Sequence, residues 1–206
     1  MIAIVDYGVG NLFSLASSLS YLGLENRVTR SEADLAAASR IILPGVGAFG
    51  DAMEKLTATG LVPALEREAA AGKPLLGICL GMQLLFEESS EYGTHAGLGL
   101  LPGRVRALAD DLRAAGFACK VPHMGWNALH LCAPACPLLR GTREGDSVYF
   151  VHSYYAVQCE SALAATAEYG VQVPAVVARG NVYGCQFHPE KSGAAGPAIL
   201  KAFAAL

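Results

Sequence analysis

Pro74-Leu75-Leu76-Gly77-Ile78-Cys79-Leu80-Gly81-Met82-Gln83 is the stretch that decides the fold. The apolar run after its proline predicts a buried strand, and the spacing of Leu80, Leu84 and Leu85 predicts a helix directly after it. The Gly-x-Cys-x-Gly pattern at the junction is that of a nucleophile elbow, a sharp turn that presents a reactive side chain at the end of a strand. Glycine suits both flanks because backbone packs against backbone there and leaves no room for side chains.

Cys79 has two interpretations at this point. A cysteine at a helix N-terminus lies near exposed amides and the positive end of the helix dipole, which favour the thiolate and hence a nucleophile. A free cysteine at the end of an apolar strand can instead be a buried structural residue, the more common fate of such a thiol. Taken alone, the motif favours the structural interpretation, and the rest of the chain must decide.

The composition predicts one compact domain, residues 1–206. The chain is 53% hydrophobic and 16% charged, which argues for a full core and against disorder. Its net charge of −3 gives no electrostatic reason to expect nucleic acid or an anionic membrane as a partner. The opening run Met1–Val5 is interrupted by Asp6, and no apolar run approaches the ~20 residues of a membrane span. We therefore expect a cytoplasmic protein.

The first half alternates short apolar runs with helical patterns, which predicts parallel strands with helices on both faces of a sheet. Ligands bind such sheets at the carboxyl ends of the strands. Cys79 and the glycine-rich loops Gly8–Gly10 and Pro44–Gly47 all lie at such ends. The predicted strands are Ile2–Val5, Asn26–Thr29, Ile41–Leu43 and the elbow strand, and the predicted helices are one capped by Asn11 and those around Asp51–Ala58 and Leu61–Ala71.

The second half predicts mixed or antiparallel additions to this sheet, because its runs are short, alternate, and are separated by Pro/Gly turns. A helix with an apolar stripe at Ile199, Leu200, Phe203 and Leu206 closes the chain. The predicted strands are Arg104–Leu108, Trp126–Leu131, Val148–Val151, Leu163–Thr166, Ala175–Ala178 and Val182–Phe187.

No cofactor is predicted from the motifs. Tyr7-Gly8-Val9-Gly10 lacks the third glycine of a dinucleotide fingerprint, and there is no Gly-Lys-Ser/Thr P-loop. Cys132 and Cys136 could form half of a metal site, but no second pair of ligands accompanies them. The six cysteines show no paired spacing, and we expect them to be reduced.

A second group of reactive residues follows the Val182–Phe187 run. In extended chain, residues two apart point to the same face, so His188 and Glu190 are expected to project together. An imidazole oriented by a carboxylate is a general base, and beside Cys79 it would complete a set of nucleophile, base and orienting acid. Alternatively, the pair is a turn with solvated charges. The two motifs together favour catalysis, because both fall at strand ends.

Gly77–Gln83 and Gln186–Glu190 together resemble the class I (triad) glutamine amidotransferases. Within that class the chain resembles the glutaminase subunits of imidazole glycerol phosphate synthases over nearly its whole length. This resemblance implies a three-layer α/β fold of the flavodoxin-like type in a single type 1 amidotransferase domain. It is carried by Asp6–Asn11, Pro44–Gly47, Phe86–Glu88, Pro122–Asn127, Tyr149–Tyr154 and His188–Ser192.

The resemblance implies that Cys79 attacks the side-chain amide of L-glutamine and forms a thioester, which water hydrolyses to glutamate. His188 would move the proton to the departing ammonia, and Glu190 would orient His188. The oxyanion hole would come from Leu80 and from the Gly45-Val46 segment, where a peptide flip is expected. The implied substrate-binding residues are Gly47, Gln83, Glu91, His152, Ser153 and Tyr154.

The resemblance also implies a heterodimer. Ammonia would pass through a channel to a (β/α)₈-barrel cyclase subunit that makes imidazole glycerol phosphate and an aminoimidazole carboxamide ribotide in histidine biosynthesis. The implied interface residues are Trp126, Asn127, Tyr149 and Lys191, with core packing of Trp126 as the alternative. The competing functions are the glutaminase subunit of another triad amidotransferase and a free-standing γ-glutamyl cysteine hydrolase.

Overall fold

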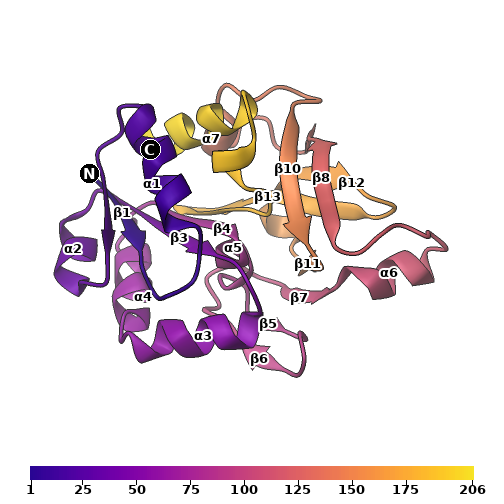
Figure 1. Cartoon of the computed structure of the whole chain (residues 1–206), viewed down its shortest axis with the longest axis horizontal. Coiled ribbons are helices and arrows are strands. Elements are labelled where there is room, and N and C mark those ends of the chain that lie inside the picture. The colour runs from indigo at the N-terminus through magenta and orange to yellow at the C-terminus, as the bar shows by residue number, and fades with distance from the viewer.

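An eight-stranded sheet in the order β2-β1-β3-β4-β14-β13-β12-β9 runs through the protein (Figure 1). The computed structural model describes all residues, 1–206. The first five strands of that order are parallel and the last three are antiparallel additions, as the sequence predicts. Their bounds are β1 (Ile2–Val5), β2 (Asn26–Thr29), β3 (Arg40–Gly45), β4 (Leu75–Cys79), β9 (His130–Leu131), β12 (Leu163–Glu168), β13 (Gln172–Arg179) and β14 (Val182–Cys185).

Helices cover both faces of this sheet, because alternate strand residues point to opposite sides. Ala3, Val5 and Leu43 belong to a core shared with α2 (Glu32–Ala37), α3 (Phe49–Ala58) and α4 (Val62–Ala70). Ile2, Ile4 and Ile42 belong to a second core shared with α1 (Leu12–Tyr21) and α7 (Ala195–Ala204). The structure therefore has the predicted three layers.

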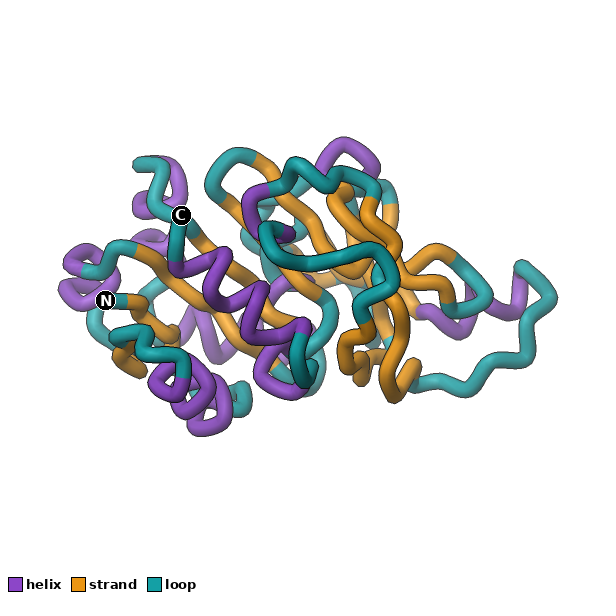
Figure 2. Tube along the Cα trace, turned by 90° about the horizontal axis from the view of Figure 1, so that it is seen from above, coloured by secondary structure: helices purple, strands orange, loops and turns teal.

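Two smaller sheets extend the second half of the chain. One pairs β8 (His123–Ala128) with β10 (Ser147–His152), and the other has the order β11-β7-β5-β6. Helix α6 (Leu108–Ala114) lies at the end of the molecule away from both termini (Figures 1 and 2). The bounds in the second sheet are β5 (Glu88–Ser89), β6 (His95–Ala96), β7 (Arg104–Ala107) and β11 (Tyr154–Val157).

Several predicted elements differ in extent. Trp126–Leu131 is not one strand: β8 and β9 lie in different sheets. The strand before the His-Pro-Glu motif ends at Cys185 rather than Phe187. Helix α5 after the elbow covers only Leu80–Gln83, because the chain turns away to bury Leu84 and Leu85.

No helix in the structure combines the length and the apolar character that crossing a membrane requires.

The elbow itself has the predicted geometry. Cys79 takes φ +54°, a left-handed backbone that few non-glycine residues adopt. A side chain at Gly81 would overlap the carbonyl oxygen of Leu43 in β3, and a Cβ at Gly77 would lie 2.6 Å from the carbonyl oxygen of Gly81. The two glycines thus let α5 pack directly against β3 and β4.

Gly81→Ala is expected to destabilise the protein by about 3 kcal/mol or more, because the new methyl group must displace backbone rather than a flexible side chain. Gly23→Ala is the matched control: Gly23 has φ +74° and no atom near its added Cβ. It should cost only about 1–2 kcal/mol of backbone strain. Urea denaturation measures both, and an equal loss in the two variants would contradict this packing explanation.

Candidate active site

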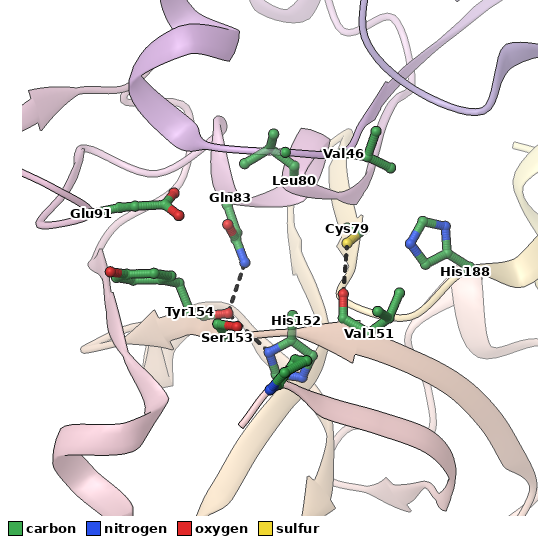
Figure 3. A pocket seen from close by; sticks show the side chains of 12 residues that line it. Val46, Cys79, Leu80, Gln83, Glu91, Val151, His152, Ser153, Tyr154 and His188 are labelled. Carbon is green, nitrogen blue, oxygen red and sulfur yellow. Dashed lines mark hydrogen bonds between the residues drawn. The ribbon is translucent and has the colours of Figure 1, made fainter. Parts of the chain in front are cut away.

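A cavity of about 370 Å³ opens beside the elbow, where β3 and β4 end (Figure 3). It brings together residues from five distant segments, including most of the residues predicted for the site. Its lining residues are Val46, Gly47, Cys79, Leu80, Gln83, Glu91, Pro122, Val151, His152, Ser153, Tyr154 and His188.

Two hydrogen bonds can form at the sulfur of Cys79. It lies 3.9 Å from the carbonyl oxygen of Val151, to which a thiol would donate, and 3.7 Å from Nε2 of Gln186. The side chain is buried, with 6% of its surface exposed, yet it faces the cavity. Cys79 is therefore partly shielded from water and still open to a ligand.

His188 and Glu190 form a buried pair next to Cys79. The distance from His188 Nδ1 to Glu190 Oε1 is 2.8 Å, and both side chains are 3% exposed, so the alternative of a solvated turn is wrong. The predicted extended backbone is found at His188 but does not continue to Glu190, because residues Pro189–Lys191 form a 3₁₀ turn. Ser192 stabilises this turn through the 2.6 Å hydrogen bond that its hydroxyl donates to the His188 carbonyl.

The His188 ring is suited to hold a proton. Burial opposes its charge, but the neighbouring Cys79 and Glu190 side chains outweigh that effect and raise the pKa of His188 to about 9. Its Nε2 atom is buried and has no hydrogen-bond partner. The nitrogen that would exchange a proton with the sulfur or with a substrate is thus not occupied by another group.

Gln83 and Glu91 both line the cavity, and both side chains are buried rather than solvated. The Gln83 Nε2 atom donates to the Tyr154 carbonyl at 2.9 Å and to Gln186 Oε1 at 3.0 Å, which leaves Oε1 of Gln83 for a ligand. Glu91 Oε2 accepts the Phe49 amide at 2.7 Å. Burial raises the pKa of Glu91 despite that bond. Both side chains can offer oxygens to a cationic ligand group.

The loop after β3 lies against the elbow. Gly45 pairs with Cys79 in the sheet, and a Cβ there would lie 2.7 Å from the Gly81 nitrogen, so Gly45 is required for space. Gly47, by contrast, has φ +97° and open space around it. The buried Tyr7 hydroxyl donates to the Pro44 carbonyl at 2.7 Å. The conformational freedom of the loop is therefore concentrated at Val46-Gly47.

Two buried histidines lie behind the cavity. His152 Nδ1 is 2.9 Å from the Tyr154 carbonyl, and its Nε2 is 3.0 Å from Nδ1 of His123. Burial lowers the pKa of His123 to about 4, and burial together with His123 lowers that of His152 to about 3. The side chain of His123 also stacks on Phe150 and Tyr169. Both rings are neutral at physiological pH.

The four predicted interface residues do not share one face. Trp126, Tyr149 and Lys191 lie together on one side of β8 and β10, whereas Asn127, the next residue in β8, points to the other side. Trp126 is 57% exposed, so the alternative of core packing is wrong. Its ring meets Tyr149 edge-on at 6.0 Å between centroids, and Lys191 Nζ lies 6.0 Å from the Tyr149 ring. Asn127 donates to the Glu168 carbonyl at 2.7 Å. This aromatic and basic face is continuous with the turn that carries His188 and Glu190.

Four further residues contact the site without a role predicted from the sequence: Gln186, His123, Tyr7 and Val151. Gln186 lies in the Gln186–Glu190 motif and His123 in the Pro122–Asn127 motif. These motifs carry the family resemblance, but they do not indicate which atoms the two side chains contact. The Val151 and Tyr154 contacts use carbonyl groups, which every residue has. No sequence pattern could have distinguished them.

Across 206 residues, no group of three or more His, Cys, Asp or Glu side chains is arranged to hold a metal ion. Cys132 is exposed and Cys136 is buried. The Cys132 sulfur instead lies 3.8 Å from the His130 carbonyl. These two cysteines therefore form no part of a ligand cluster.

Known proteins match this chain over nearly its whole length. The family model for glutamine amidotransferase class-I matches residues 3–205. Imidazole glycerol phosphate synthase subunit HisH of Syntrophotalea carbinolica is 51% identical over 98% of both chains. The protein of the same name from Bacillus licheniformis is 55% identical over 98% of this chain and 95% of the relative.

Solved structures show the same fold at low sequence identity. A glutamine amidotransferase crystal structure matches 100% of both chains with a TM-score of 0.75 and 19% identity. The structure of PurLQS from Thermotoga maritima matches 98% of this chain and 96% of its own with a TM-score of 0.72 and 22% identity. These likenesses bear on the fold alone.

Glu190→Gln is expected to lower the pKa of His188 by about one unit or more, since it keeps an acceptor for Nδ1 but removes the negative charge. Because the pKa of His188 is higher in the folded than in the unfolded protein, protonation of its ring stabilises the fold. This stabilisation is complete below about pH 6.5 and is lost as the pH rises through about 9. The variant should therefore lose less stability over that range. An NMR titration of the His188 ring measures the shift.

Glu144→Gln is the matched control, because Glu144 Oε1 lies 2.7 Å from Nδ1 of the exposed His130. That change should leave the titration of His188 where it is. Equal His188 midpoints in wild type and Glu190→Gln would contradict the assigned cause.

Proposed function

Because the chain belongs to the class I glutamine amidotransferase family, we propose that it is the glutaminase subunit of an imidazole glycerol phosphate synthase. One observation carries this proposal: about half of the residues match subunits of that name over 98% of the chain. The buried cysteine, histidine and glutamate around one cavity supply the chemistry that such a subunit requires.

Cys79 is the proposed nucleophile. His188 takes the thiol proton, and the Glu190 carboxylate stabilises the imidazolium that forms, so the sulfur can attack the side-chain amide carbon of L-glutamine. The imidazolium then gives its proton to the departing nitrogen, which leaves as ammonia. A water molecule, deprotonated by His188, hydrolyses the γ-glutamyl thioester to glutamate and restores the thiol.

The oxyanion of each tetrahedral intermediate needs backbone donors. We assign one to the Leu80 amide, because the first amides of a helix have no intrahelical acceptor. The other is assigned to the Gly45-Val46-Gly47 segment, where a peptide rotation would aim an N–H at the cavity. The open space and positive φ at Gly47 support such a rotation, while Gly45 stays fixed against Gly81.

The other end of glutamine is assigned to the opposite wall of the cavity. Gln83 Oε1 and the Glu91 carboxylate offer acceptors for its α-ammonium group. His152, Ser153 and Tyr154 also line the cavity, below Gln83 and Cys79 in the view of Figure 3. Glu91 is buried and its pKa is raised, so an ammonium partner would be particularly favourable there.

The ammonia produced here needs a protected path, since neutral water would protonate it and end its nucleophilicity. We propose that a (β/α)₈-barrel cyclase subunit docks on Trp126, Asn127, Tyr149 and Lys191 and receives the ammonia through a channel. It would form imidazole glycerol phosphate and an aminoimidazole carboxamide ribotide in the cytoplasm. An exposed tryptophan packed on a tyrosine is typical of an interface anchor.

Glutaminase activity of the purified chain should rise on the order of 10- to 100-fold when the cyclase subunit and its nucleotide substrate are added together. The reason is that an oxyanion hole completed by rotation at Val46-Gly47 requires a conformational bias from the partner. Cys79→Ala in the same complex should reduce activity to below about 10⁻³ of wild type. Full activity of the isolated chain would contradict the subunit assignment, and undiminished activity of Cys79→Ala would contradict the mechanism.

A further inference from the structure

Gln186 is a completely buried polar side chain that the mechanism above does not use. Its Nε2 atom lies 3.7 Å from the Cys79 sulfur, within hydrogen-bonding distance for a sulfur acceptor. It comes two residues before His188, so the same stretch of chain carries both side chains to the nucleophile. Either the nitrogen or the oxygen of its amide can face the sulfur, and only the nitrogen can donate to it.

The contacts of Gln83 fix the orientation of that amide. Gln83 must direct its nitrogen at the Tyr154 carbonyl, 2.9 Å away, because a carbonyl oxygen only accepts hydrogen bonds. The same nitrogen lies 3.0 Å from the other amide, so the atom facing it there must be the acceptor, Oε1 of Gln186. The donor end of Gln186 consequently faces Cys79.

The Tyr154 carbonyl is in turn held by the two buried histidines. His152 must carry its proton on Nδ1 to donate to that carbonyl, so its Nε2 accepts from Nδ1 of His123. Asn127 lies 3.5 Å from the remaining nitrogen of His123, and its own orientation is set by bonds to Ala128 and Glu168. The donor and acceptor roles from Asn127 to Gln186 are thereby determined.

The electrostatic consequence appears when Cys79 loses its proton. The Val151 carbonyl then presents a negative oxygen to a negative sulfur, which disfavours the thiolate. A hydrogen bond from a neutral amide to an anion is stronger than one to a neutral acceptor, so Gln186 acts in the opposite direction. It is the one side-chain amide that donates to the sulfur.

We propose that Gln186 is a further catalytic residue, whose side-chain amide donates a hydrogen bond to the Cys79 thiolate and sets the reactivity of that sulfur. The inference rests on the proposed role of Cys79 as nucleophile. Gln83, Tyr154 and the His152–His123 pair act as positioning groups that keep the amide in this orientation.

The test is the rate at which iodoacetamide alkylates Cys79, followed against pH by peptide mass mapping of the full chain. Gln186→Leu removes the donor without adding charge, and it should lower the rate at pH 7 about tenfold and move the midpoint up by about one pH unit. Gln186→Glu keeps an acceptor for Gln83 but places a carboxylate oxygen at the sulfur, so its loss should be larger.

Gln172→Glu makes the same substitution at an exposed position of β13 and should leave the alkylation profile unchanged. In wild-type protein, the side-chain amide resonance of Gln186 should titrate with the alkylation midpoint, and this titration should vanish in Cys79→Ala. That measurement needs no variant at Gln186 and so does not depend on how well the variants fold.

An unchanged alkylation profile in folded Gln186→Leu, or a Gln186 resonance that ignores the titration, would overturn the proposal. The alkylation rate requires neither glutamine nor a partner. A failure of the proposed function would therefore appear in the glutaminase assay alone, whereas a failure of this inference would appear in the alkylation profile.

Discussion

Direct packing of the Gly81 backbone on the Leu43 carbonyl is the contact on which the rest of the site depends. It brings the elbow of β4 against the end of β3 with no side chain between them. Cys79 can then hold its left-handed backbone and turn its sulfur into the cavity rather than into the core. The same contact places Gly45 opposite Cys79, so the nucleophile and the loop proposed to stabilise the oxyanion share one rigid junction.

The second constraint is that polar groups around the sulfur are buried and must be paired. Glu190 Oε1 pairs with His188 Nδ1, the two histidines behind the cavity pair with each other, and so do the Gln83 and Gln186 amides. His188 Nε2 and Glu190 Oε2 are left without a hydrogen-bond partner. An unpaired buried group is costly unless a ligand or a proton transfer uses it. One of these two atoms is the nitrogen that the proposed chemistry needs. The paired groups also connect Asn127 in β8 to the nucleophile through donors and acceptors of defined orientation.

The sequence was sufficient to predict the elbow, the parallel half of the sheet and the His188–Glu190 pair, because each has a local pattern: flanking glycines, β-branched runs, or two reactive residues at a strand end. It predicted the pair for the wrong reason, since a 3₁₀ turn rather than extended chain joins the two residues. It overestimated α5 because Leu84 and Leu85 fit a helical stripe equally well when buried in a turn. The role of Gln186 depends on Gln83, more than one hundred residues away in sequence, and such a contact has no local pattern.

The elbow is proposed to place the Cys79 thiol where it can attack glutamine. Trapping the acyl intermediate tests this most directly. The complex is mixed with glutamine, quenched in acid within a turnover, digested and analysed by mass spectrometry. We expect one γ-glutamyl group on the peptide that contains Cys79, and none on the other five cysteines. Turnover without any acylated Cys79, or acylation of a different residue, would contradict it.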